Sequence, residues 1–177
     1  MMKQKGTDLL MCTIQGAVLV VFLTAKAGSA GADTLEGELG GESRSWHVLR
    51  DGQTSTARFS NVAPGVVVYR VQGHAEEKFA IAESVALSFT AMNGSLIGTP
   101  EVSYFPENSL FPVYSNQGGG KLTLEHLKSG EDTVVLKGRY QGSLERLEGI
   151  GKDASGGDSL TLDLFFDVRL RPGDEQE

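Results

Sequence analysis

Cysteine is almost absent from this chain: Cys12 is the only cysteine among 177 residues. A single cysteine excludes a disulfide within the chain, so the fold must be held by its hydrophobic core alone. Cys12 lies before the densest apolar stretch, directly behind Met11. A lipid-anchored cysteine would follow that stretch behind a small residue, so we expect no lipid anchor.

Basic residues are fewer than acidic ones. The chain has 16 Lys and Arg against 23 Asp and Glu, a net charge of −7 at pH 7. Loss of the first 32 residues would remove three lysines and one aspartate and leave 13 against 22, a net charge of −9. Such acidity disfavours nucleic acid and anionic membranes as partners, and it favours solubility.

Histidine is scarce, and none of the three histidines has a histidine or cysteine partner at metal-ligand spacing. His74, with Glu76 and Glu77 beside it, is expected in a solvated turn. His126 falls on the apolar register of its predicted strand and is expected at the edge of the core. His47 is expected to be exposed. The sequence therefore gives no motif for zinc or general-base chemistry.

The longest apolar run lies near the N-terminus. Lys3 and Lys5 precede it, the run covers Leu9 to Ala25, and small residues fill positions 27–32. This order is typical of a secretory signal peptide, and the dense apolar part is shorter than a typical membrane span. We expect residues 1–32 to be removed, with an uncleaved anchor as the alternative. Residues 33–177 would then form one periplasmic or secreted domain without a membrane span.

A strict two-residue alternation marks the C-terminal part. Between Ser159 and Arg171 apolar residues fall on even positions, and polar residues fall on odd positions except at Phe165. Side chains of a β-strand alternate between its two faces, so the pattern predicts a long strand with one buried face. That face consists of Leu160, Leu162, Leu164, Phe166, Val168 and Leu170.

Shorter segments elsewhere show the same alternation. Residues 121–127 and 133–147 flank a Gly-Glu-Asp turn, which predicts a hairpin. Gly138 and Gly142 fall on the apolar face of the second segment and indicate a bend, a bulge or close packing. Low helical content is expected, with one helical turn within Ala75–Ala86. Eight to ten strands predict an all-β domain, an antiparallel β-sandwich, with a curled meander or barrel as the alternative.

Two weak motifs lie together before the last strand. Gly157-Asp158-Ser159-Leu160 resembles the nucleophile motif of a lipase and esterase family, but no histidine follows it as that family requires. Asp153 and Asp158, with Ser155 between them, are oxygen ligands of the kind that calcium prefers, yet calcium needs six to eight oxygens. We therefore expect neither a hydrolase nor a metal here, and no cofactor.

Four aromatic residues gather around Pro106 and Pro112. Exposed rings on a β-sheet loop are a common means of gripping a sugar, and the alternative is that these rings cap the core. The candidate ligand-binding residues are Tyr104, Phe105, Phe111 and Tyr114.

The leading interpretation is an exported, non-catalytic binding or accessory protein, with a protein or a carbohydrate as its partner. A small periplasmic hydrolase or metal-dependent enzyme is the alternative. A structural subunit of an envelope assembly is the third, because free edge strands can pair with another chain.

Overall fold

The computed structural model describes residues 33–52, 54–129, 133–150 and 158–173, and this part of the chain contains strands and no helix. No helix in the described part could therefore cross a membrane. The helical turn expected within Ala75–Ala86 is wrong, because 74–83 is an irregular loop. The strands are β1 Thr34–Leu39, β2 Glu42–Ser45, β3 Arg50–Asp51, β4 Thr54–Ser55, β5 Ala57–Ala63, β6 Val66–Gly73, β7 Ser84–Met92, β8 Ser95–Phe105, β9 Val113–Ser115, β10 Lys121–Ser129, β11 Val134–Leu147 and β12 Ser159–Pro172.

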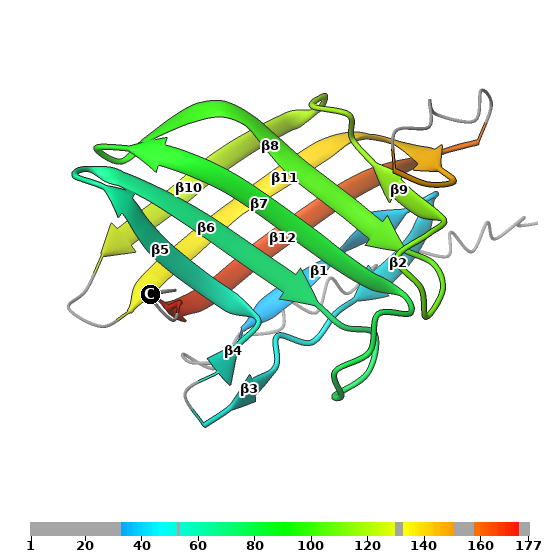
Figure 1. Cartoon of the computed structure of the whole chain (residues 1–177), viewed down its shortest axis with the longest axis horizontal. Coiled ribbons are helices and arrows are strands. Elements are labelled where there is room, and N and C mark those ends of the chain that lie inside the picture. The colour runs from blue at the N-terminus through cyan, green and yellow to red at the C-terminus, as the bar shows by residue number, and fades with distance from the viewer. Residues whose placement is uncertain (1–32, 53, 130–132, 151–157, 174–177) are drawn as a thin grey trace, which may run out of the picture.

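Ten of these strands form one continuous sheet that closes on itself. The order is β10-β11-β9-β8-β7-β6-β5-β12-β1-β2, and β11 also pairs with β12, so the strands from β5 to β9 form a ring with β11 and β12. In Figure 1 the strands β5 to β8 make a front layer that crosses a back layer of β10, β11, β12, β1 and β2. The all-β prediction is confirmed. Two separate sheets are not confirmed, because β9 and a parallel β5–β12 contact join the layers.

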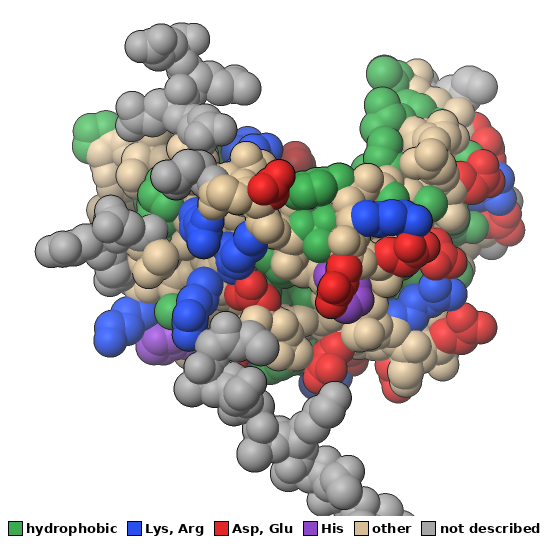
Figure 2. Space-filling model, turned by 90° about the horizontal axis from the view of Figure 1, so that it is seen from below, with side chains coloured by type: hydrophobic (Ala, Val, Ile, Leu, Met, Phe, Trp, Pro, Cys, Tyr) green, Lys and Arg blue, Asp and Glu red, His purple; other side chains and the backbone are tan. Residues whose placement is uncertain are grey.

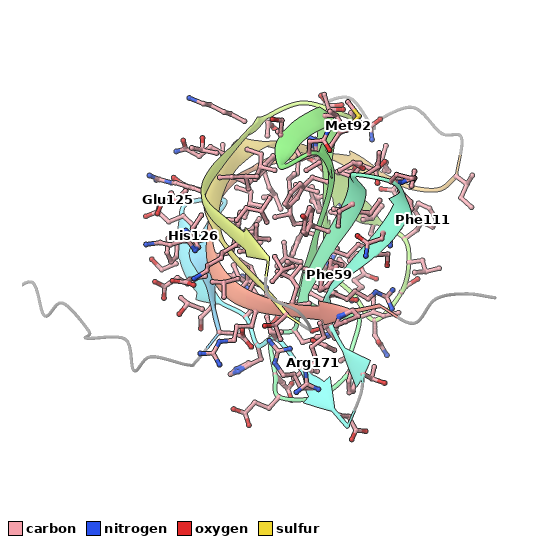
Figure 3. The ribbon with its side chains drawn as sticks, turned by 90° about the vertical axis from the view of Figure 1, so that its left-hand side faces the viewer. Phe59, Met92, Phe111, Glu125, His126 and Arg171 are labelled. Atoms are coloured by element: carbon pink, nitrogen blue, oxygen red, sulfur yellow. The ribbon has the colours of Figure 1, made fainter. Side chains whose placement is uncertain are left out.

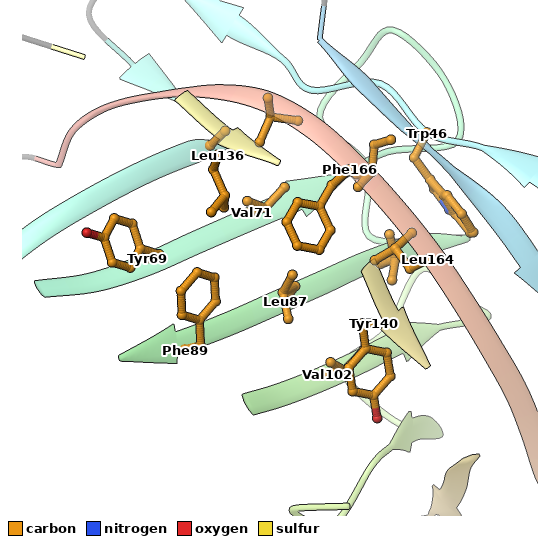
Figure 4. Close-up of a cluster of buried hydrophobic side chains, with 14 of the residues drawn as sticks. Trp46, Tyr69, Val71, Leu87, Phe89, Val102, Leu136, Tyr140, Leu164 and Phe166 are labelled. Carbon is orange, nitrogen blue, oxygen red and sulfur yellow. The ribbon is translucent and has the colours of Figure 1, made fainter. Parts of the chain in front are cut away.

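The core lies between the two layers. From Leu162 to Leu170 the even positions of β12 are at most 2% exposed, and Leu160 packs against the core from its edge. Figure 4 shows Leu164 and Phe166 meeting Val71 and Leu87 of the front layer. The side chains fill the space inside the ring (Figure 3). The predicted buried face of the last strand is therefore confirmed.

Two glycines of β11 provide room for large aromatic side chains. A Cβ at Gly138 would lie 2.7 Å from the ring of Phe166, and a Cβ at Gly142 would overlap the hydroxyl of Tyr140. Tyr140 and Phe166 are both fully buried. The close packing expected at these glycines is confirmed.

A β-bulge changes the expected position of His126. The register between β10 and β11 shifts between Leu124 and His126, so Glu125 is inserted without a partner of its own. An inserted residue reverses the face of every later side chain. His126 is therefore exposed, and the prediction that it lies at the core edge is wrong.

Candidate functional site

The four candidate aromatic residues do not form a single flat surface. Tyr104 is 5% exposed, and burial raises the pKa of its hydroxyl. Its ring lies 6.4 Å from that of Tyr114, which packs against the core. Phe105 and Phe111 are only partly buried, and Phe105 points to the opposite face from Tyr104 because the two are neighbours on β8. Tyr104 therefore serves the core, and a sugar contact at Phe105 or Phe111 stays a prediction.

Most of the acidic loop that was considered for calcium is not described by the structure. Asp153 and Ser155 lie outside the described residues. The Asp158 carboxylate is exposed and lies 3.5 Å from Nη1 of Arg146. In the described ranges no three His, Cys, Asp or Glu side chains gather where they could hold an ion.

His47 and His74 lie side by side, joined by two backbone hydrogen bonds of 2.8 and 3.0 Å. The solvated turn expected at His74 is wrong, because this side chain is only 4% exposed. Its Nδ1 lies 2.7 Å from the Ala80 carbonyl oxygen, and its buried Nε2 has no partner among the described atoms. His47 is exposed as expected, 3.7 Å from Glu77. His74 therefore fixes the 74–83 loop.

That loop borders a groove of about 360 Å³ on the outer face of the front layer, which we call the front groove. The floor of the groove is low because β7 turns the small side chains of Ala86 and Ser88 outward. The larger side chains of β7 point into the core. Phe79 stands at the groove with 59% of its surface exposed. The groove is lined by Thr54, Ser55, Thr56, Arg58, Arg70, Val71, Gln72, Phe79, Ala86, Leu87, Ser88, Glu101 and Ser103.

Two arginines of the front groove stand directly opposite each other. Arg58 on β5 is the register partner of Arg70 on β6. Both side chains are exposed, and neither makes a hydrogen bond or an ion pair with any residue in the described part of the chain. Like charges in directly opposed positions destabilise a sheet. The pair therefore carries a cost in stability that no ion pair within the described ranges offsets.

The positive charge continues onto the next strand. Arg171 on β12 is the parallel register partner of Arg58, so Arg70, Arg58 and Arg171 lie on three adjacent strands; we call them the arginine row. Arg171 projects outside the ring, where its Nη1 donates a hydrogen bond of 2.6 Å to the Gly52 carbonyl, whereas Phe59 points inward (Figure 3). Arg169 lies two residues earlier on the same face. Figure 2 shows several Lys and Arg side chains close together in its left half, and others beside acidic side chains in its right half.

A larger hollow of about 540 Å³ on the back layer is lined by two arginines, Arg44 and Arg139, and each is paired with an acidic residue. Arg139 makes a two-pronged ion pair with Asp163, which also accepts a hydrogen bond of 3.0 Å from Gln141. The Arg139 hydrogen bond lowers the pKa of the Asp163 carboxyl. Lys137 lies 3.3 Å from Glu125 at the same surface. These ion pairs make the back hollow a poorer anion site than the front groove, despite its greater volume.

Sequence reasoning missed the arginine row. Alternation along 54–60 and 66–73 places Arg58 and Arg70 on polar faces, and the Pro64-Gly65 turn between them indicates a hairpin. The turn alone pairs Ala63 with Val66 and would set Arg58 opposite Val71. A β-bulge between Asn61 and Ala63 shifts the register and brings Arg58 opposite Arg70, and local pattern gave no sign of that bulge. Arg171 had no local signal either, because its contact with Arg58 depends on strands far apart in the chain.

Comparisons with family models, with curated proteins and with solved structures found no match for this chain. The function must therefore be inferred from the site itself. The front groove and the arginine row are the two features of the described surface that point to a ligand.

Proposed function

We propose that this is an exported, non-catalytic binding or accessory protein that holds an anionic ligand in the front groove. The observation that supports this is the opposed pair Arg58 and Arg70, exposed and without an acidic partner in the described part of the chain. A guanidinium group presents two parallel N–H donors that match a carboxylate, sulfate or phosphate. An anion between the two side chains would relieve their repulsion.

The lining of the front groove favours binding over catalysis. Its only acidic residue is Glu101, and it contains no histidine or cysteine. Ser88 and Glu101 are register partners, but no hydrogen bond joins their side chains in the described structure. A serine without an activating base is a poor nucleophile. The polar groups there are suited to orienting a ligand instead.

A structural subunit remains the second candidate, because the described sheet ends in two edge strands, β10 and β2. Both edges carry charges, however. Lys121, Glu125 and Lys128 are exposed on β10, and Glu42 is exposed on β2. Charged side chains on an edge oppose pairing with another chain. Binding through the front groove is therefore the better-supported function.

Titration calorimetry with inorganic phosphate at constant ionic strength tests the proposal. We expect saturable one-site binding that falls at least tenfold in Arg58→Gln and in Arg70→Gln. Lys121→Gln is the matched control, because this exposed lysine lies on β10, away from the groove. Phosphate binding that is equal in all four proteins, or no binding by the unaltered chain, would refute the proposal.

A further inference from the structure

We propose that the ligand is an acidic oligosaccharide that lies across β6, β5 and β12, with successive carboxylates on the arginine row. This inference rests on the proposed function, because its first carboxylate occupies the site between Arg58 and Arg70. Beyond the proposed function, this inference specifies the chemical class of the ligand, its direction on the surface and the dependence of its affinity on length.

The spacing of the row favours a ligand with repeated charges. Adjacent strands lie about 4.8 Å apart, and opposed side chains begin about 4.5–5.5 Å apart. Arg70, Arg58 and Arg171 therefore lie in a line across three strands, with Arg171 also bonded to the Gly52 carbonyl. Arg169 is an exposed fourth arginine, and its side chain makes no hydrogen bond or ion pair with a described residue. A single small anion satisfies only part of this array, whereas a chain of acidic units satisfies all of it.

The remaining lining favours a sugar as the unit that carries the charge. Ser88 and Gln72 offer uncharged donors and acceptors, which suit hydroxyl groups. Phe79 adds an exposed ring that can pack on the C–H face of a pyranose. Edgewise contact with the buried His74, at 5.8 Å between ring centroids, holds the Phe79 ring in place. Polyphosphate would use the arginines but has no apolar face for Phe79.

Glu101 gives the ligand a direction. In the strand register, Arg70 is opposite Ser88, and Ser88 is opposite Glu101, so the carboxylate stands at the β8 end of the row. It would repel an anion placed beyond Ser88. The acidic chain therefore runs from the groove toward β12 and stops before β8.

Oligogalacturonates of one to four units, measured by calorimetry at constant ionic strength, test this inference. We expect the affinity of the unaltered protein to rise at least tenfold from the monomer to the trimer. Arg171→Gln and Arg169→Gln should each lower trimer affinity several-fold and leave monomer affinity unchanged. Arg171→Lys, which keeps the charge, should restore part of the loss. Glu101→Gln should raise the affinity for every length.

Three comparisons separate failure of the inference from failure of the proposed function. Phe79→Ala should weaken galacturonate binding and leave phosphate binding unchanged, and methyl-esterified oligomers should not bind. If phosphate binds through Arg58 and Arg70 but galacturonate affinity does not rise with length, the inference is wrong and the proposed function stands. If tripolyphosphate binds more tightly than trigalacturonate, and Phe79→Ala does not change its affinity, the assignment of the ligand as an oligosaccharide is also wrong. If neither phosphate nor galacturonate binds, both proposals fall.

Discussion

Gly142 lies directly against the hydroxyl of Tyr140, two residues earlier on the same face of β11. The Tyr140 side chain is fully buried, and its hydroxyl donates a hydrogen bond of 3.2 Å to the Gly119 carbonyl. Because a Cβ at Gly142 would occupy the place of that hydroxyl, the two residues depend on each other. The largest fully buried side chain of the described core therefore requires the smallest residue next to it.

Gly142→Ala should destabilise the protein by about 1–3 kcal/mol, since the added methyl group forces the Tyr140 ring to move within a packed core. Chemical denaturation monitored by Trp46 fluorescence measures the loss. Ser143→Ala is the control, because Ser143 is exposed on the same strand and should change stability by less than about 0.5 kcal/mol. Equal stability of Gly142→Ala and the unaltered protein would show that Tyr140 does not need this space.

Arg70→Gln should raise the melting temperature at low ionic strength, because it removes a like-charge pair worth about 0.2–1 kcal/mol. Added sodium chloride screens the repulsion, so the gain should shrink as salt increases. Differential scanning calorimetry at low and high salt measures both effects. A melting temperature lowered at all salt concentrations would mean that Arg70 stabilises the sheet and that its repulsion with Arg58 is negligible.

Leu164→Asp should unfold the domain. Leu164 is fully buried, and a charge there would have no partner in an apolar core, a cost comparable with the whole stability of a domain. The adjacent change Asp163→Asn removes the ion pair with Arg139 at a partly exposed position and should cost less than about 1 kcal/mol. Circular dichroism and melting of the two variants give the comparison. A folded Leu164→Asp protein would contradict the assignment of this face to the core.

Stability should fall as the pH rises above about 10, the ordinary pKa of tyrosine. Burial raises the pKa of Tyr69, Tyr104 and Tyr140, so the unfolded chain loses these protons before the folded chain does. Their contribution is therefore complete below the unfolded pKa and is lost as pH rises through the higher folded pKa. Denaturation series between pH 8 and 11 measure the slope. Tyr140→Phe should reduce it, and an unchanged slope would exclude Tyr140 as a contributor.

The pattern of apolar and polar residues was sufficient to predict those parts of the fold in which segments close in the sequence pair with each other. The buried face of β12 and the β10–β11 hairpin follow from two-residue alternation and a turn. The bulge at Glu125 was missed, because one inserted residue leaves the composition of the strand unchanged. The parallel contact of β5 with β12 was missed for a different reason: it joins distant segments, and no local signal specifies the partner.

The difference between local patterns and contacts of distant segments also decides which parts of the candidate site the sequence could predict. A cluster of aromatic residues near two prolines predicted a ligand contact at Tyr104, yet strand alternation turns this side chain into the core. The arginine row consists of ordinary polar-face residues, and its charge becomes unusual only when three strands are brought together. A functional feature made by strand pairing is therefore harder to predict than one carried by a contiguous motif.

The position of β12 in the sheet has a consequence for the nascent chain. β12 is the last strand of the described chain, and it is bordered by β1, β11 and β5. Synthesis begins at the N-terminus, so all three neighbours are made before the strand that joins them. Until then only β9 joins the two layers in the described structure, and the ring stays open. Closure of the ring is therefore the last step open to the nascent chain, and it waits for the final described strand.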